Sequence, residues 1–281
     1  MNSEQLRGWI GPEEFREGRA TAAPLKVMAA TLDHSTSRDF ACGDTVPSLW
    51  HRTHLLRRPR QSQLGKDDRP VNVDLQPRVT LPPRIWAGGL IKCSRLLHVG
   101  QKISRRSAIS DVSFKEGRTR SSAFVKLHHV TSNDGGIAIV DNQDNVYRNP
   151  PKPAPRPATP LISRTDAQWS RTVKPKVPLL FRYSALTFNG HRIPYDRPCA
   201  EGQESYGVVV HGPFIATLLL NLLRSKIPDA CLVAHDFHAV HPLLDTTTFE
   251  VCRRTPEPGT MSLWAVDAKG FLATGATARI A

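Results

Sequence analysis

The chain contains 281 residues, with 38 Lys and Arg against 25 Asp and Glu, which gives a formal net charge of +13. This length accommodates two modest domains or one large domain. No apolar run approaches the roughly 18 residues expected of a membrane-spanning helix, and the N-terminus lacks the charged-then-apolar order of a secretory signal. We therefore expect a globular, cytoplasmic protein without a membrane partner.

The first half of the chain is predicted to contain one helix followed by strands. Residues 22–33 are rich in helix formers and carry a proline near their start, where proline is tolerated. Alternating apolar and polar residues then predict strands at 90–93, 102–112, 121–131 and 137–147. Glycine-containing turns at 116–117 and 133–136 separate the later strands from one another.

A proline-rich connector follows this half. Residues 149–160, NPPKPAPRPATP, contain six prolines and should form an extended, polyproline-like linker. The predicted domains are therefore an N-terminal domain at 1–148, the linker at 149–160 and a C-terminal domain at 161–281. In the C-terminal domain, the same alternation predicts strands at 231–240, 247–253, 261–266 and 271–280.

A long apolar helix is predicted to begin at Gly212. Pro213 suits the first turn of a helix, because the amide that proline lacks would be unpaired there anyway. Residues 215–223 are apolar except at Thr217 and Asn221, so this helix should be buried nearly all round. The start of such a helix offers free N–H groups and a positive dipole end to a carbonyl or an anion.

The two halves also match each other locally. Residues 95–100 lie in their half where 241–245 lie in the other, and 127–130 correspond to 263–266. The order of a helix followed by strands, present twice, indicates a duplication. Pattern alone predicts an α+β fold with antiparallel sheet.

Several segments resemble the MaoC-like hot-dog hydratases and dehydratases, and within them the two-domain branch that includes 3-methylfumaryl-CoA (mesaconyl-C4-CoA) hydratases. The matching segments are LRGWIG (6–11), RQSQLG (60–65), RIWAGG (84–89), FRYSALTFNGHR (181–192), YDRP (195–198) and VVHGPFIATLL (209–219). They extend over nearly the whole chain. The resemblance implies a double hot-dog fold, in which two antiparallel sheets each wrap a central helix.

The resemblance also implies addition of water to the α,β-double bond of an acyl thioester, or its removal. This reaction needs an acid and a base for the water and the α-proton, plus donors for the thioester oxygen. The family pattern holds the water with an Asp and a His five residues later, and an ungapped alignment places Asn189 and Pro194 in these slots. The two-domain branch commonly has Asn in the first slot and reads NGHRIHYD. Asn189 therefore fits the branch, whereas Pro194 departs from it and cannot take a proton.

Two more catalytic residues are predicted beside these slots. His191 is the nearby side chain that titrates near neutral pH, so it is predicted to transfer a proton or to position the water. The alternative is that His191 tethers the loop by hydrogen bonds. Gly212 is predicted to bind the thioester oxygen through its backbone N–H. The alternative is a glycine required for close packing of helix against sheet.

The remaining predicted site residues would bind the substrate. Arg60 and Arg84 suit a carboxylate or a phosphate, or else are simply solvated. The resemblance implies that the acyl or pantetheine channel is lined around Trp86, which could equally be a core residue. The full predicted substrate-binding set is Arg60, Arg84, Trp86, Gly88, Gly89, Tyr195, Asp196 and His211. Of these, Tyr195 and Asp196 could instead order the loop, and His211 could instead pack or cap at the helix start.

The positive charge is concentrated in residues 50–120, which hold 16 Lys and Arg against 5 Asp and Glu. Three interpretations are open: an ordinary basic surface, a surface for CoA or an acyl carrier, and, least favoured, nucleic acid, for which no recognisable motif is present. Two other functions also remain open. One is an acyl-CoA thioesterase, and the other is a non-catalytic acyl-CoA binder, which Pro194 favours. A homodimer is left open as the assembly.

The five cysteines are scattered, odd in number and without CxxC spacing. This pattern favours buried thiols in a reducing compartment over a disulfide framework or a metal site. His235, His238 and His241 also lack a recognisable metal-ligand arrangement. We therefore expect neither a metal nor a cofactor.

Overall fold

The structure, a computed structural model, describes residues 8–34, 39–65, 68, 70, 75, 84–116, 121–148, 159–201 and 207–281. The elements of the first half are β1 (Glu13–Arg19), α2 (Ala22–Thr31), β2 (Arg84–Cys93), β3 (Lys102–Glu116), β4 (Ser121–Asn133) and β5 (Gly136–Arg148). Short 3-10 helices lie at Trp50–Thr53 and Gln61–Gln63. The elements of the second half are β6 (Trp169–Val173), α3 (Val177–Leu186), α4 (Arg197–Glu201), α5 (Gly212–Lys226), β7 (Leu232–Ala239), β8 (Phe249–Glu257), β9 (Thr260–Asp267) and β10 (Leu272–Ile280).

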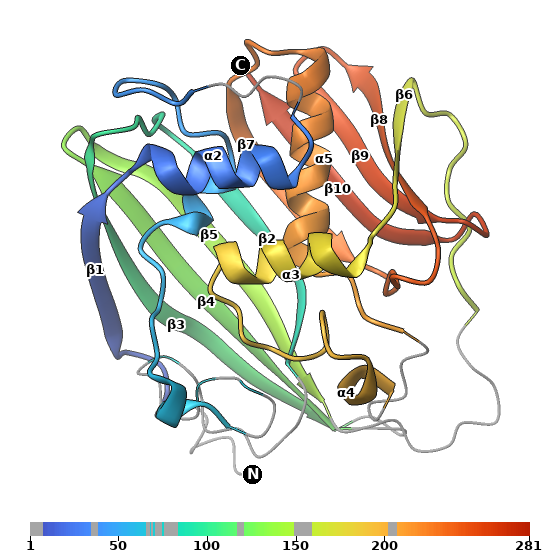
Figure 1. The fold of residues 1–281 in the computed structure, drawn as a ribbon, viewed down its shortest axis with the longest axis horizontal. Coiled ribbons are helices and arrows are strands. Elements are labelled where there is room, and N and C mark those ends of the chain that lie inside the picture. Colours follow the sequence, from blue (N-terminus) through green and yellow to red (C-terminus); the bar gives the residue numbers. More distant parts are fainter. Residues whose placement is uncertain are drawn as a thin grey trace.

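The described strands form one antiparallel sheet in the order β1-β3-β4-β5-β2-β7-β10-β9-β8-β6. Figure 1 shows this sheet curving behind α2, α3 and α5, so that the helices cover its inner face. The two halves meet edge to edge, where β2 pairs with β7.

The strand order is symmetric about the β2–β7 pair, in agreement with the predicted duplication. The predicted pairing of the helices is wrong, because α2 follows the edge strand β1 as α3, not α5, follows the edge strand β6, and the described strands form one sheet and not two. Each strand of the first half has a counterpart in the second: β1 with β6, β3 with β8, β4 with β9 and β5 with β10. The local matches agree, because isolated bridges Thr45–His98 and Val209–Leu244 occupy equivalent places before β3 and β8. Residues 149–158 of the predicted linker lie outside the described residues, and the domain boundaries stay a prediction.

The elements not predicted from the sequence are β1, β6, α3, α4 and the two 3-10 helices. The strand β1, EEFREGR, carries two arginines and three glutamates and lies at one edge of the sheet. Charged residues are common on edge strands because they discourage pairing with other chains. The strand β6 is the other edge and has only 5 residues. Neither edge strand shows the alternation by which the inner strands were predicted.

The helix α5 is the central buried helix that the sequence predicts. Every residue from Phe214 to Leu223 is buried. The two polar positions are accommodated by hydrogen bonds, since the Thr217 hydroxyl donates to the Pro213 carbonyl at 2.9 Å and Asn221 accepts from the Trp50 indole at 3.3 Å. The main core gathers around this helix, which fixes the position of its N-terminal end.

All five cysteines are free in the structure. Cys42 and Cys231 are exposed, however, so the expectation of buried thiols is wrong for these two: Cys42 lies in a turn, and Cys231 directly precedes β7. In the part of the chain that the structure describes, we find no helix that is both long enough and apolar enough to cross a bilayer.

Candidate active site at the start of α5

The start of α5 presents backbone donors beside a polar loop. Gly212 and Pro213 are the first two residues of α5, and His211 precedes them with an extended backbone. The first amides of a helix have no partner within the helix, and proline contributes none, so the N–H groups of Gly212 and Phe214 lie at the helix end. The peptide dipoles make this end positive. An oxygen that gains negative charge would therefore be stabilised here.

The Trp86 indole lies against Gly212. A β-bulge between Trp86 and Gly88 shifts the register of β2 against β5, and a bulge of this kind redirects a side chain. A Cβ added to Gly212 would lie 3.0 Å from Cε3 of the Trp86 indole. The indole also stacks on Phe237 of β7, with ring centroids 4.7 Å apart. The predicted site glycine thus lies directly against the predicted channel residue.

His211 supports the start of the helix as a buried, neutral imidazole. Its Nε2 lies 2.7 Å from the Ser184 hydroxyl oxygen, and its ring meets Tyr183 edge-on at 5.2 Å. Burial lowers the pKa of His211 to about 3. The side chain is therefore uncharged at neutral pH. These contacts favour the packing role, and contact between His211 and substrate stays a prediction.

Asn189 and His191 lie in the loop that follows α3. The Asn189 side-chain oxygen accepts a hydrogen bond from the His191 backbone N–H at 3.2 Å, and the Tyr195 hydroxyl donates to the Gly190 carbonyl at 2.8 Å. These bonds cross the loop and hold its conformation. The order they impose positions the Asn189 amide and the His191 ring, which are the polar groups predicted to handle water.

Arg192 and Asp196 brace the same loop from its other side. The Arg192 Nε donates to an Asp196 carboxylate oxygen at 2.7 Å, and the other Asp196 oxygen accepts from the Cys199 N–H at 3.1 Å. Arg192 also approaches Asp68 of the first half, with its Nε 3.6 Å from Oδ2. The polar atoms of Asp196 are thus used within the protein, which favours its alternative role of ordering the loop.

The loop is tied both to α3 and to the segment leading into α5. The Asn189 N–H donates to the Ser184 carbonyl at 2.8 Å, and the Val209 N–H donates to the Ile193 carbonyl at 3.3 Å. Pro194, the next residue, is buried. Contacts from Asn189 through Ser184 to His211 therefore bring the predicted loop residues and Gly212 into one region between α3 and α5.

For the other predicted substrate-binding residues, the structure gives no contact that requires a role in substrate binding. A Cβ at Gly88 would collide with the Phe237 carbonyl oxygen, and one at Gly89 with that of Asn142. Close approach of neighbouring strands is enough to account for both glycines. Arg60 is exposed at the start of a short 3-10 helix, and Arg84 has only its backbone described, in β2. Their contact with substrate stays a prediction.

Sequence reasoning missed Ser184 and Arg52. Ser184 was detectable, because the buried residues Leu180, Tyr183 and Ser184 follow the three- and four-residue spacing of a helix face. Arg52 had no local signal: its guanidinium lies 4.9 Å from the centroid of Trp86, and its Nη2 lies 2.9 Å from Asp141 Oδ2. These partners are distant in the sequence.

We expect the free energy of unfolding to decrease as the pH is lowered from about 6.5 to about 4. Burial lowers the pKa of His211 to about 3 and that of His235 to about 4, whereas a histidine in an unfolded chain titrates near about 6.5. In this window the unfolded chain binds more protons, so each histidine removes about 1.4 kcal/mol of stability per pH unit. Urea midpoints at a series of pH values measure the slope.

A matched pair of variants assigns part of this slope. His235→Leu should lower the slope of unfolding free energy against pH by the contribution of about one proton. His238→Gln, on the same strand but 69% exposed, should leave this slope unchanged. A stability that stays constant or rises as the pH falls through this window would contradict the neutral, buried state of these histidines.

Comparison with known proteins agrees with this geometry. The solved structure of a MaoC-like dehydratase from Phytophthora capsici matches with a TM-score of 0.72 and 13% identity, over 100% of this chain and 99% of that one. HtdX of Mycobacterium tuberculosis matches with a TM-score of 0.68 and 17% identity, over 96% of this chain and 100% of that one. The fold is therefore that of the MaoC-like dehydratases, which confirms the predicted hot-dog architecture.

Relatives that are similar in sequence extend the comparison from the fold to the family. The family model for hydroxyacyl-thioester dehydratase type 2 matches residues 50–245. The mesaconyl-C(4)-CoA hydratase of Chloroflexus aurantiacus is 36% identical over 100% of this chain and 99% of that protein. The mitochondrial hydroxyacyl-thioester dehydratase type 2 of Schizosaccharomyces pombe is 26% identical over 82% of this chain and 86% of its own length. The chain belongs to the hydroxyacyl-thioester dehydratase type 2 family. It is accordingly a hydro-lyase of acyl thioesters, as the resemblance implied.

Proposed function

We propose that this protein hydrates an α,β-unsaturated acyl-CoA thioester of the 3-methylfumaryl-CoA type, or catalyses the reverse dehydration, between the loop at 189–196 and the start of α5. The observation that carries the proposal is the position of Gly212. Gly212 is the first residue of a buried helix, at its positive end, and the Trp86 indole lies on the side where a Cβ would project. Ser184 links this helix start to the loop that bears Asn189 and His191, since its hydroxyl contacts His211 and its carbonyl accepts from the Asn189 N–H. An N–H group placed in this way suits an oxygen that becomes enolate-like.

In the proposed mechanism the thioester carbonyl oxygen accepts a hydrogen bond from the Gly212 N–H. The Asn189 amide holds a water molecule next to the β-carbon. His191 accepts a proton from this water as its oxygen bonds to the β-carbon, and the electrons of the double bond move toward the thioester oxygen. The imidazolium of His191 then returns this proton to the α-carbon as the carbonyl re-forms, which leaves His191 neutral again. Water is thereby added across the double bond, with atoms and charge balanced.

The neutral His211 and Ser184 have a supporting role in this proposal. Their 2.7 Å contact ties α3 to the residue before Gly212. Because burial keeps the pKa of His211 at about 3, its imidazole does not take up a proton at neutral pH. The donor at Gly212 is thus held rigidly, and proton transfer is left to the loop.

Pro194 supports one alternative, a protein that binds acyl-CoA without turning it over. It occupies the slot in which the family pattern has a histidine, and it has neither a donor nor an acceptor in its side chain. In the binder, Gly212 and Trp86 would still hold the thioester. Only the rate of water addition separates this alternative from the hydratase.

The deciding experiment is incubation of the protein with crotonyl-CoA and, separately, with a mesaconyl-CoA thioester. Loss of the enoyl-thioester absorbance, with the hydroxyacyl product identified by mass, is the expected result. Tight binding without turnover would establish the binder instead. Release of free CoA thiol would establish a thioesterase and overturn the hydratase. The same acyl group on an acyl carrier protein tests which carrier presents the substrate.

A further inference from the structure

A polar cluster lies on the inner face of the first half, away from the loop at 189–196. Glu14, Ser107, His129 and Asp141 are successive cross-strand neighbours on β1, β3, β4 and β5. Directly opposed residues of neighbouring strands point to the same face. The hydrogen bond of 2.8 Å between His129 Nδ1 and the Ser107 hydroxyl follows this row. The row crosses the sheet beneath the segment at 50–57.

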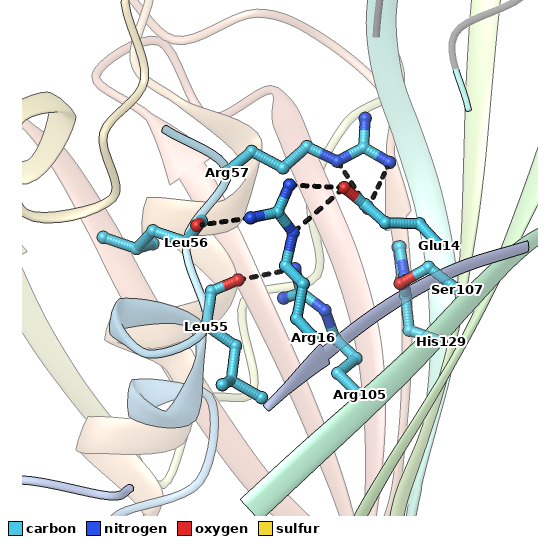
Figure 2. Close-up of polar contacts among 8 residues, drawn as sticks. All are labelled: Glu14, Arg16, Leu55, Leu56, Arg57, Arg105, Ser107 and His129. Atoms are coloured by element: carbon cyan, nitrogen blue, oxygen red, sulfur yellow. Dashed lines mark hydrogen bonds and ion pairs between the residues drawn. The ribbon is translucent and has the colours of Figure 1, made fainter. Parts of the chain in front are cut away.

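Four arginines surround this row, and Figure 2 shows three of them: Arg16 and Arg57 reach Glu14, and Arg105 reaches the carbonyl of Leu55. Arg16 and Arg57 each hydrogen-bond Glu14 at 2.9 Å. Arg105 donates to the Leu55 carbonyl at 2.8 Å. The fourth, Arg52, pairs with Asp141 at 2.9 Å. We call these four arginines with Glu14 and Asp141 the arginine cluster.

The arginine cluster holds an excess of positive charge. Its four guanidinium groups face two carboxylates, and hydrogen bonds and charge from Arg16 and Arg57 keep Glu14 ionised by lowering its pKa in spite of burial. Burial lowers the pKa of the neighbouring His129 to about 4, so this ring adds no charge at neutral pH. Among the described residues, two positive charges in the cluster thus lack a carboxylate. Cations removed from water without an anion are costly.

Two N–H groups of the cluster are buried and have no hydrogen-bond partner among the described residues: Nε of Arg105 and Nε of Arg52. Burial, and then the charges of Arg57 and Arg16, lower the pKa of Arg105. The fork of a guanidinium matches a carboxylate better than it matches a single carbonyl. An added carboxylate would satisfy these donors and remove part of the repulsion.

The cluster is continuous with the proposed thioester site. Arg52 lies over the Trp86 indole, with 4.9 Å between its Cζ and the ring centroid, and Trp86 in turn contacts the position of Gly212. An acyl group whose carbonyl oxygen is at Gly212 would pass Trp86 to reach Arg52. The ends of a four-carbon diacid are separated by carbon–carbon bonds of about 1.5 Å each, so its second carboxylate extends in this direction by several ångströms.

We infer that the arginine cluster binds the free carboxylate of the acyl group, through Arg52 and Arg105, and thereby selects monothioesters of dicarboxylic acids. The inference rests on the proposed placement of the thioester oxygen at Gly212. The acyl chain lies along Trp86, and its far carboxylate approaches the Nε atoms of Arg52 and Arg105 beneath the segment at 50–57. Acyl groups that end in a methyl group leave the two positive charges uncompensated and bind more weakly.

A purely structural role accounts for part of the cluster. Arg16 and Arg105 bond the carbonyl groups of Leu56 and Leu55, and Arg57 bonds Glu14, which fastens the segment at 50–57 to the sheet. Fastening does not require more positive than negative charge. It also predicts no difference between neutral and charged acyl groups, so a comparison of ligands separates the two roles.

The test compares succinyl-CoA with butyryl-CoA, which have four-carbon acyl groups and no double bond to hydrate. Stopped-flow tryptophan fluorescence gives Kd for each with the full-length protein. The unmodified protein is expected to prefer succinyl-CoA by about 10–100-fold, the effect of charged hydrogen bonds. In Arg105→Gln this preference should be largely lost. Arg106→Gln is the matched control, because Arg106 is the next residue of β3 and is 59% exposed on the other face.

Equal affinity of the unmodified protein for the two thioesters overturns the inference, whatever the variants do. It is also overturned if Arg105→Gln and Arg106→Gln retain the same preference, or if free succinate binds as tightly as succinyl-CoA, which would indicate a site for free anions. Melting temperatures identify a variant that has not folded, and Arg105→Lys, which keeps the charge but not the fork, then takes its place. A preference for succinyl-CoA without any hydration of enoyl-CoA would support the carboxylate site and reject the proposed reaction. Hydration of enoyl-CoA without this preference would support the reaction and reject the carboxylate site.

Discussion

Pro194→His is expected to raise the rate of enoyl-CoA hydration by about 10²–10⁴-fold, the range for one general acid–base group. Pro194 is buried next to Ile193, whose carbonyl accepts from the Val209 N–H on the approach to α5. An imidazole at this position would add a group that can accept and donate a proton to the loop that carries Asn189. The measurement is kcat/KM with the thioester that the protein turns over best, from about pH 5.5 to about pH 8.5, a range that includes the ordinary imidazole pKa of about 6.5.

Two further variants separate the added imidazole from a change in the loop. Proline fixes φ near about −65°, so Pro194→Ala relaxes the backbone without adding a base and should not raise the rate. His191→Ala should abolish the activity of the unmodified protein, because His191 is the proposed proton carrier. If the unmodified protein works at ordinary enzymatic rates and His191→Ala matches it, the assignment of this loop is wrong.

Gly212→Val is expected to lower turnover by about 10²–10³-fold, the scale of losing one oxyanion donor. A Cβ at this position is already 3.0 Å from the Trp86 indole, so a branched side chain displaces the indole and crowds the thioester oxygen. The rate loss should appear in kcat with the protein still folded, as judged by its melting temperature. Unchanged kinetics in a folded variant would remove Gly212 from the site.

Packing against Trp86 is the competing explanation, and a double variant addresses it. In Gly212→Ala combined with Trp86→Leu, the smaller side chain leaves room for the added methyl group, so stability lost through crowding should return. If stability returns while the rate stays below that of Trp86→Leu alone, packing against Trp86 does not account for the loss of rate. Gly275→Ala is the glycine control, since nothing lies within 4 Å of a Cβ at that position.

The sequence by itself determined the inner strands, the central helix and the family. Alternation predicted β3, β4 and β5 nearly to their ends, and the apolar run after Pro213 predicted α5, because these elements are buried and their side-chain periodicity is set by what they cover. The paired order of elements also predicted the duplication. Glycine at the start of α5 and the polar loop before it were local signals that pointed to Gly212, Asn189 and His191.

Only the tertiary structure decided how the two halves join, where the edges lie and which charges meet. β1 was hidden by its charged residues, and the β2–β7 pairing joins residues more than a hundred positions apart, for which no local pattern exists. The same holds for Arg52 and Asp141, separated by 89 residues. Local periodicity reports only whether a side chain is buried. The Coulomb energy of a buried charge depends on which distant residues the sheet brings beside it, and so the arginine cluster could be read only from the folded chain.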